Sequence, residues 1–140
     1  MADPLLLLDT HVWIWLLTGD KKLASSKCLP HINEAAKHSA IKVSAISVWE
    51  VGMLESKGRI KFSMDCLRWV QQALEAPGTS LAPMTPEIAV ESCRLPGNFH
   101  GDPADRIIIA TARILGACLV TDDKKILAYG KKHSLKTLTV

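Results

Sequence analysis

Five acidic side chains stand where predicted strands give way to predicted helices. The five are Asp9, Glu50, Asp102, Asp105 and Asp123. In an open parallel sheet the carboxyl ends of the strands share one edge, and ligands bind along that edge. We therefore expect these acids, which come from distant parts of the chain, to meet there. Gathered carboxylates repel one another unless a cation lies between them, and a hard divalent cation with oxygen ligands is the simplest such cation.

The elements that must position these acids alternate between strands and helices along the whole chain. This alternation is typical of a parallel sheet. The predicted strands are Leu5–Leu8, Lys42–Ala45, Leu81–Met84, Ala117–Thr121 and Lys136–Thr139. No repeat, low-complexity tract or linker interrupts the pattern. We therefore expect a single α/β domain over residues 1–140, with a central parallel sheet of about five strands flanked by helices.

Capping and breaking residues set the expected helix ends. Five predicted helices have both ends marked: Thr10 to Thr18, about Ser26 to His38, Ser47 to Lys57, Asp102 to Gly116 and Lys124 to Tyr129. Another is capped by Ser63 and ends before Pro77, and a further one begins at Thr85-Pro86. The helix after Asp102 is apolar on nearly every side, which predicts that it is buried and holds Asp105 rigidly.

Composition excludes several classes of protein. Hydrophobic residues make up 48% of the 140 residues, which excludes a disordered tail protein. No apolar run is long enough to span a membrane, and the N-terminus lacks the pattern of a signal peptide. The four cysteines are scattered without a Cys-x-x-Cys pair, which argues against zinc ribbons and thioredoxin-like chemistry. We expect a cytoplasmic protein with reduced thiols and no membrane partner.

The charge balance indicates a polyanionic partner. The net charge is +3, from 17 basic and 14 acidic residues. If the five acids named above form one site, the rest of the chain holds 17 basic and nine acidic residues, a net charge of +8. An acidic pocket on a basic surface suits a polyanion that is held by its phosphates and processed through a metal.

Each of the first two acids has a purely structural alternative. Asp9 can cap the helix that follows it, since Asp is a favoured N-cap residue. Ser47-Val-Trp-Glu50 fits a capping box, in which the Glu side chain returns to the amide of the N-cap residue. Taken alone, Glu50 fits the capping box better than a metal site. A role as metal ligand is favoured only because the other acids are expected at the same edge of the sheet.

The last acids come in two pairs. Asp102 occupies an N-cap position before Pro103, so it can cap while Asp105 points across the strand ends. Asp122 and Asp123 are adjacent after a strand, so only one is expected to reach the site, and geometry does not choose between them.

Several cationic residues are candidates to pair with an acid of the site or to contact phosphate. Arg106 is the natural charge partner or phosphate contact beside Asp105, and the segment from Lys57 to Lys61 and the pairs Lys124-Lys125 and Lys131-Lys132 are candidate backbone contacts or solvated faces.

Several other chemistries lack their motifs. The five histidines show no metal-ligand spacing, which argues against a histidine zinc site. A glycine-rich phosphate loop and a Gly-x-Ser-x-Gly elbow are both absent from the sequence. The second residue after Asp9 is His11 rather than Asp, which argues against an aspartate-based phosphatase.

Four sequence blocks, taken together, resemble a known family. They are Leu8-Asp9-Thr-His-Val-Trp-Ile-Trp15, Ser47-Val-Trp-Glu50, His100-Gly-Asp-Pro-Ala-Asp-Arg-Ile-Ile-Ile-Ala-Thr-Ala112 and Leu119-Val-Thr-Asp-Asp123. In order and spacing they are similar to the PIN-domain ribonucleases, and among those to the VapC-type toxins of toxin–antitoxin pairs. The likeness covers nearly the whole chain.

This resemblance implies roles for individual residues. Asp9, Glu50, Asp105 and Asp123 match the family's acids, which implies that these four are catalytic and bind Mg²⁺ or Mn²⁺. Asp123 is selected over Asp122 because the family acid stands two places after the Thr. The remaining residues around the acids, expected to support the metal ligands, are Asp102, Thr121, Asp122 and Arg106. The resemblance also implies an RNA substrate, an inhibiting antitoxin protein and a homodimer.

The tryptophans add modest support for a dimer. Four in so small a domain exceed the obvious needs of its core. Helix geometry cannot place Trp13 and Trp15 on one face, so we expect one of them to be exposed in a partner-binding surface.

Three hypotheses follow. The first is an endoribonuclease dependent on magnesium or manganese, in which a metal-activated water attacks the scissile phosphodiester. The second is a phosphoryl-transfer or receiver-like domain with Asp9 as phosphate acceptor. The third is a non-catalytic interaction module in which the acids only cap helices.

Overall fold

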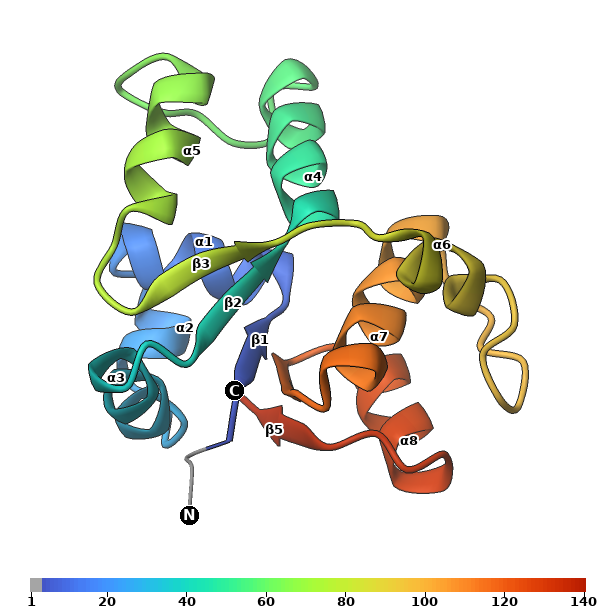
Figure 1. Cartoon of the computed structure of the whole chain (residues 1–140). Helices are drawn as coiled ribbons and strands as arrows, with labels where there is room; N and C mark the ends of the chain where they lie inside the picture. Colours follow the sequence, from blue (N-terminus) through green and yellow to red (C-terminus); the bar gives the residue numbers. More distant parts are fainter. Residues whose placement is uncertain (1–3) are drawn as a thin grey trace.

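A five-stranded sheet with every neighbouring pair parallel forms the centre of the molecule (Figure 1). The computed structural model describes residues 4–140. The strands are β1 (Leu6–Leu8), β2 (Ile41–Ser44), β3 (Thr79–Ala82), β4 (Cys118–Thr121) and β5 (Thr137–Thr139), and their order across the sheet is β3-β2-β1-β4-β5. β1 is therefore the central strand, and the α/β class with a parallel sheet is confirmed.

The leucines of β1 show why this strand lies in the middle. Leu6, Leu7 and Leu8 are all buried, as expected of a strand covered on both faces. Successive side chains point to opposite faces of a strand. Accordingly, Leu6 and Leu8 join one hydrophobic cluster and Leu7 joins the other.

The helices form a layer on each side of the sheet (Figure 1). They are α1 (Thr10–Thr18), α2 (Lys21–Ala24), α3 (Leu29–Lys37), α4 (Ala45–Ser56), α5 (Cys66–Leu74), α6 (Pro86–Ser92), α7 (Pro103–Leu115) and α8 (Lys124–Lys132). The first five pack into the cluster of Leu6 and Leu8, and the last three into the cluster of Leu7. As predicted, α7 is buried, with Ile108, Ile109 and Ala110 fully covered. No helix in residues 4–140 has both the length and the apolar character needed to cross a membrane.

Two of the wrongly predicted helix starts arise because a different residue caps the helix. The Ser44 hydroxyl accepts a hydrogen bond from the Ile46 amide (3.1 Å) and caps α4, so Ser47 lies inside the helix. Asp65, rather than Ser63, caps α5 through the Arg68 amide (3.3 Å). In both cases a residue with a side-chain acceptor stood close to the expected cap, and sequence alone offered no register to choose between them.

The other helix differences arise at short or unusual segments. The short helix α2, capped by Asp20, was not predicted, and α3 begins at Leu29 rather than near Ser26. The last helix continues through Gly130 to Lys132 instead of ending at Tyr129. A Cβ at Gly130 would lie 2.9 Å from the Leu135 carbonyl oxygen, so this glycine permits a close approach rather than a helix end.

The third strand lies two residues earlier than predicted. The prediction placed Leu81–Met84 in the sheet, whereas β3 spans Thr79–Ala82 and pairs Thr79 with Ile41 of β2. Leu81 and Met84 are exposed because β3 is an edge strand. The prediction treated these apolar residues as buried, which they are not.

The exposed tryptophan is not one of the two expected. Trp13 and Trp15 are both buried, which makes that prediction wrong, and Trp69 stacks on Phe62 with ring centroids 4.4 Å apart. Trp49 on α4 is 58% exposed.

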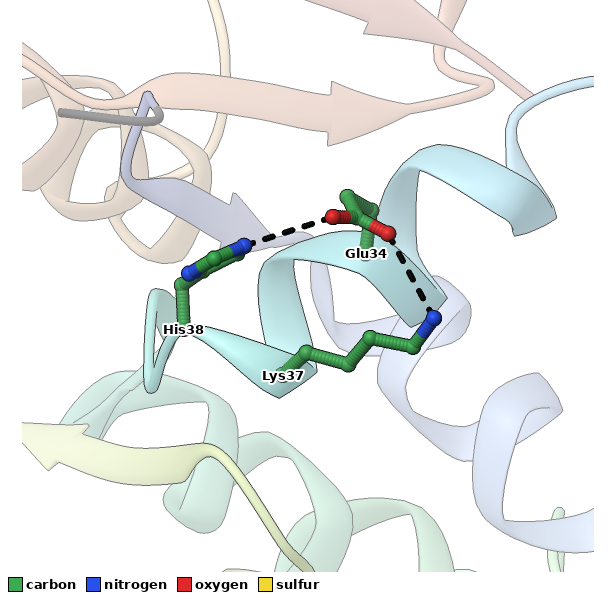
Figure 2. A network of polar contacts seen from close by, with 3 residues as sticks. All are labelled: Glu34, Lys37 and His38. Atoms are coloured by element: carbon green, nitrogen blue, oxygen red, sulfur yellow. Dashed lines mark hydrogen bonds and ion pairs between the residues drawn. The ribbon is translucent and has the colours of Figure 1, made fainter. Parts of the chain in front are cut away.

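The polar surface is illustrated by the end of α3 (Figure 2). Glu34 lies 3.6 Å from the Lys37 ammonium and 3.3 Å from Nε2 of His38, and the hydrogen bond to His38 is the main reason why the pKa of Glu34 is lowered. These groups are exposed, so the network contributes little to stability.

Candidate active site

The acids from distant segments approach one another at the carboxyl edge of the sheet. Asp9 directly follows the central strand β1, and Asp123 comes two residues after its neighbour β4. Glu50 lies on α4, which follows β2, and Asp105 lies in the first turn of α7. Figure 1 shows the starts of α1, α4 and α7 converging above the central strands. The sheet topology therefore brings these carboxylates into one electrostatic environment.

Asp9 is buried and held from two sides. Its Oδ1 accepts a hydrogen bond from the Thr10 amide (2.8 Å), so Asp9 does cap α1. Its Oδ2 accepts a hydrogen bond from the hydroxyl of Thr121 at the end of β4 (2.7 Å). Burial raises the pKa of Asp9, and the two hydrogen bonds partly oppose that rise. The carboxylate is thus fixed in place although capping alone would not require its burial.

Glu50 is held by hydroxyl groups rather than by a helix end. The Thr10 hydroxyl lies 2.5 Å from Glu50 Oε1 and 2.8 Å from the Ser47 hydroxyl. A hydroxyl has one hydrogen, so Thr10 donates to the carboxylate while Ser47 donates to Thr10. Burial raises the pKa of Glu50, and the charges of Asp9 and Asp102 raise it further. The capping-box alternative for Glu50 is therefore wrong.

Asp102 caps α7 as expected, and the Asp105 carboxylate takes no part in that cap. Oδ1 of Asp102 accepts a hydrogen bond from the Asp105 amide (2.9 Å) and caps α7. Asp105 is half-buried, and no hydrogen bond to its carboxylate occurs within residues 4–140. Burial is the first cause that raises the pKa of Asp105 to about 7, followed by the negative charges of the other four acids. Those four are Asp102, Asp9, Asp123 and Glu50. The ionised Asp105 carboxylate is therefore repelled by all four of the other acids.

The neighbouring acids after β4 differ in position. Asp122 is exposed, whereas Asp123 is half-buried and its charge raises the pKa of both Asp9 and Asp105. The Asp123 amide donates to the Thr121 hydroxyl (3.0 Å), and its Oδ1 accepts from the Lys125 and Ile126 amides. Of the two acids, Asp123 is the one whose charge acts on the others.

The expected ion pair of Arg106 is not formed. No ion pair or hydrogen bond of its side chain occurs within residues 4–140, and its buried Nε has no partner there. Arg106 instead lines a hollow beside the loop that precedes α7. As a charge partner for Asp105, this residue was predicted wrongly.

The donor chemistry of the site suits a hard divalent cation, although its side chains are not arranged as a closed cage. Among residues 4–140, no three Asp, Glu, His or Cys side chains together stand ready to hold a metal ion. Several carboxylate oxygens are instead turned toward protein donors, as for Asp9 and Glu50. Carboxylates that raise one another's pKa nevertheless favour a cation among them. A partly hydrated ion bound through a few carboxylates fits this arrangement better than a fully protein-ligated ion.

Sequence reasoning missed Thr10 and Ser47 as supports of the site. The signal was present, because Ser47 stands three residues before Glu50 and so shares a helix face with it. That spacing was interpreted as a capping box instead. Ser47 is fully buried, and a buried hydroxyl of this kind needs a hydrogen-bond partner.

Comparisons with known proteins point to one family. The PIN domain family model matches residues 6–132. The chain is 38% identical to Ribonuclease VapC22 of Mycobacterium tuberculosis over 122 residues, which are 86% of this chain and 88% of that protein. Its structure resembles the DNA-bound VapBC of Salmonella typhimurium, with a TM-score of 0.68, 14% identity and coverage of 97% and 98% of the two chains. It also resembles the toxin–antitoxin complex from Klebsiella pneumoniae, with a TM-score of 0.55, 23% identity and coverage of 87% and 89%. At these identities the two structures show a shared fold.

Proposed function

Because this chain belongs to the PIN domain family, we propose that it is a metal-dependent endoribonuclease and the toxin of a toxin–antitoxin pair. The observation that carries the proposal is the crowding of carboxylates around Asp105, whose pKa rises to about 7. Four separate segments supply these acids at the ligand-binding edge of the sheet. The likeness to a named ribonuclease supports RNA as the substrate.

We assign the metal site to Asp9, Glu50, Asp105 and Asp123, with Mg²⁺ or Mn²⁺ as the ion. When bound, the ion would lower the pKa of a water molecule and offset the charge that develops on the leaving oxygen. Magnesium usually keeps several waters and binds through one or two carboxylates plus substrate phosphate. A site without three converging side-chain ligands in the described part of the chain is compatible with this mode of magnesium binding.

The residues of the chain itself have separable tasks in this proposal. Thr121 fixes Asp9 and also accepts a hydrogen bond from the Asp123 amide, so one hydroxyl sets the relative positions of two acids. The Thr10 hydroxyl fixes Glu50, and the Ser47 hydroxyl in turn fixes that of Thr10. Asp105 carries no such hydrogen bond within the described part of the chain, so it is the carboxylate freest to turn.

A phosphoaspartate mechanism is disfavoured by the surroundings of Asp9. Both of its carboxylate oxygens accept hydrogen bonds, and the side chain is only 9% exposed. A phosphate acceptor needs an oxygen that an incoming phosphorus atom can reach. Asp9 is better placed to hold a cation than to attack a phosphate.

We propose two protein partners. The first is an antitoxin, because the chain shares the fold seen in a toxin–antitoxin complex. The second is another copy of this chain, which would cover the exposed Trp49. Trp49 lines a hollow of about 470 Å³ together with the apolar residues Ile46, Met53 and Pro103, and the acids Glu50 and Asp102 border the same hollow. Exposed apolar surface of this kind is typical of a protein–protein contact.

Cleavage of a structured RNA by the purified protein tests the function. We expect products with Mg²⁺ or Mn²⁺, none with chelator, and none from the Asp9→Asn variant at any metal concentration. The matched control is Asp65→Asn, which changes a helix-capping acid of α5 that has no part in the site. Acid-quenched protein incubated with a labelled small phosphodonor should carry no phosphate. Equal cleavage under chelation would refute the metal-dependent mechanism.

A further inference from the structure

A small basic hollow lies beside the acids, on the loop between α6 and α7. Its volume is about 150 Å³, and its walls include Arg94, Asn98 and His100 of the loop and Arg106 of α7. None of the described residues that line it is acidic. Arg106 directly follows Asp105 in the chain, so this hollow and the acidic site share the first turn of α7. The two sites are adjacent and opposite in charge.

The guanidinium of Arg106 has no acidic partner in the described part of the chain, although Asp105 precedes it directly. Within residues 4–140 its side chain makes no hydrogen bond or ion pair, and its Nε is buried without a partner. Buried polar groups in native proteins are nearly always paired. An unpaired arginine facing a polar hollow therefore points to an anion supplied from outside the chain.

The loop that forms the hollow is held in place by two hydrogen bonds from α8. The Tyr129 hydroxyl donates to the Pro96 carbonyl (2.7 Å), and the Lys125 ammonium donates to the His100 carbonyl (3.2 Å). A second hollow of about 300 Å³ lies on the other side of the segment Asn98–His100, and Lys125 and Lys132 line it. No acidic residue is among the described residues of that lining either. The basic surface therefore continues past the first hollow along the same loop.

We propose that Arg94, His100 and Arg106 bind a backbone phosphate of the RNA next to the scissile phosphate. This inference rests on the proposed ribonuclease function and adds a substrate-positioning site to it. Arginine is suited to the task because its planar fork of donors matches phosphate oxygens. The carboxylates themselves repel phosphate when no cation is present, so affinity for the strand must come from groups outside the acidic site.

The position of the hollow explains what this contact would do. Asp105 and Arg106 are consecutive residues in the first turn of α7. In this proposal, a strand whose scissile phosphate lies at Asp105 therefore places a neighbouring phosphate at Arg106. Contacts to phosphates set register and orientation and carry no sequence information. The hollow would therefore fix which bond along a bound strand faces the acids.

Binding of a labelled single-stranded RNA in chelator, where cleavage is silent, tests the contact directly. We expect Arg106→Gln to weaken binding about tenfold, as loss of one charge-assisted contact predicts. The slope of log affinity against log salt should fall by about 0.7, the value for one phosphate contact on a single strand. Arg94→Gln, at an exposed loop position, should act in the same direction. Arg106→Lys should keep the salt slope but lose affinity, because the ammonium lacks the planar fork.

The matched control is Arg68→Gln, which removes the same charge from an exposed position on α5, across the sheet from α7 (Figure 1). Circular dichroism identifies a variant that fails to fold; if Arg106→Gln does, Arg94→Gln carries the test. A second arm uses the RNA instead of the protein. Single methylphosphonate linkages remove the charge of one phosphate at a time, and cleavage by wild type with Mg²⁺ gives the scissile position.

The outcomes separate this contact from the function on which it rests. The proposal is supported if the neutral linkage next to the scissile bond weakens wild type but not Arg106→Gln. It is overturned if Arg106→Gln and Arg94→Gln bind with the affinity and salt slope of Arg68→Gln while wild type still cleaves. If wild type neither binds nor cleaves single-stranded or structured RNA, the ribonuclease function fails, and this inference fails with it.

Discussion

Replacing Asp105 by Asn should make the metal-free protein more stable at neutral pH. The change keeps the shape of the side chain and removes one of the crowded negative charges. No hydrogen bond to the Asp105 carboxylate occurs in the described part of the chain, so the amide loses no partner. A residue whose only role was structural would lose stability or stay neutral on the same change.

The size of the effect follows from the pKa of Asp105. Its rise from 3.8 to about 7 corresponds to at most about 4 kcal/mol at about 1.36 kcal/mol per pH unit. Asp105 is only half-buried, so solvent screening reduces the expected gain to about 1–2 kcal/mol.

The sign of the pH dependence is fixed by linkage. A raised pKa means that the folded state holds its proton more tightly than the unfolded state. Between about pH 4 and pH 7 the unfolded wild type ionises first, so the folded wild type loses stability as the pH rises. The advantage of Asp105→Asn should be absent near pH 4, grow through this range and level off above pH 7.

Urea unfolding in chelator at pH 4 to 8 measures this advantage, and a magnesium titration supplies the second half of the test. An ion at a hundredfold excess over its Kd stabilises the native state by about 2.7 kcal/mol. Wild type should show this gain and Asp105→Asn a much smaller one. Asp65→Asn is the control, since Asn caps a helix about as well as Asp. The reasoning is refuted if Asp105→Asn destabilises the metal-free protein and magnesium protects both forms equally.

Three further changes test the supports of the site and its surface. Thr121→Val leaves Asp9 Oδ2 without its donor, so the free energy of unfolding should fall by about 1–3 kcal/mol. In steady-state kinetics, kcat should fall by a larger factor than KM rises. Thr121→Ser keeps the hydroxyl and should retain most of the activity. Thr10→Val should loosen Glu50 in the same way while Thr10→Ser rescues it, and an unchanged kcat in Thr10→Val would show that this hydroxyl does not position Glu50. Trp49→Ser should shift a dimer toward monomer in sedimentation velocity, and a wild type that stays monomeric at every concentration would remove the dimer proposal.

The fold was predictable where the sequence signals are local and strong. The leucine run of β1, the Asp102-Pro103 start of α7 and the glycine after α7 each indicate an element without reference to the rest of the chain. The third strand was misplaced because its register is set by pairing with β2 rather than by its own residues. The cap of α4 was misplaced because Ser44 and Ser47 are equally good candidates until the end of β2 is known.

The acids of the site were predictable for a different reason. Each stands at or just after the carboxyl end of a strand or in the first turns of a helix, and a parallel sheet brings such positions to one edge. Their supports depend on which side chains meet across elements. The contact between Thr10 and Glu50 joins α1 to α4, and no spacing in the sequence gives it. Arg106 was expected to pair with the acid beside it, yet it lines a hollow together with residues of the loop that precedes α7.

Direct binding of Mn²⁺, measured by titration calorimetry or paramagnetic resonance, tests most sharply whether these acids form a metal site. We expect wild type to bind the ion, and Asp9→Asn, Glu50→Gln, Asp105→Asn and Asp123→Asn each to weaken binding about tenfold or more. Asp122→Asn and Asp65→Asn should bind as wild type does, because the first carboxylate is exposed and the second caps α5. No bound Mn²⁺ in wild type, or equal affinity in all six variants, would contradict the site.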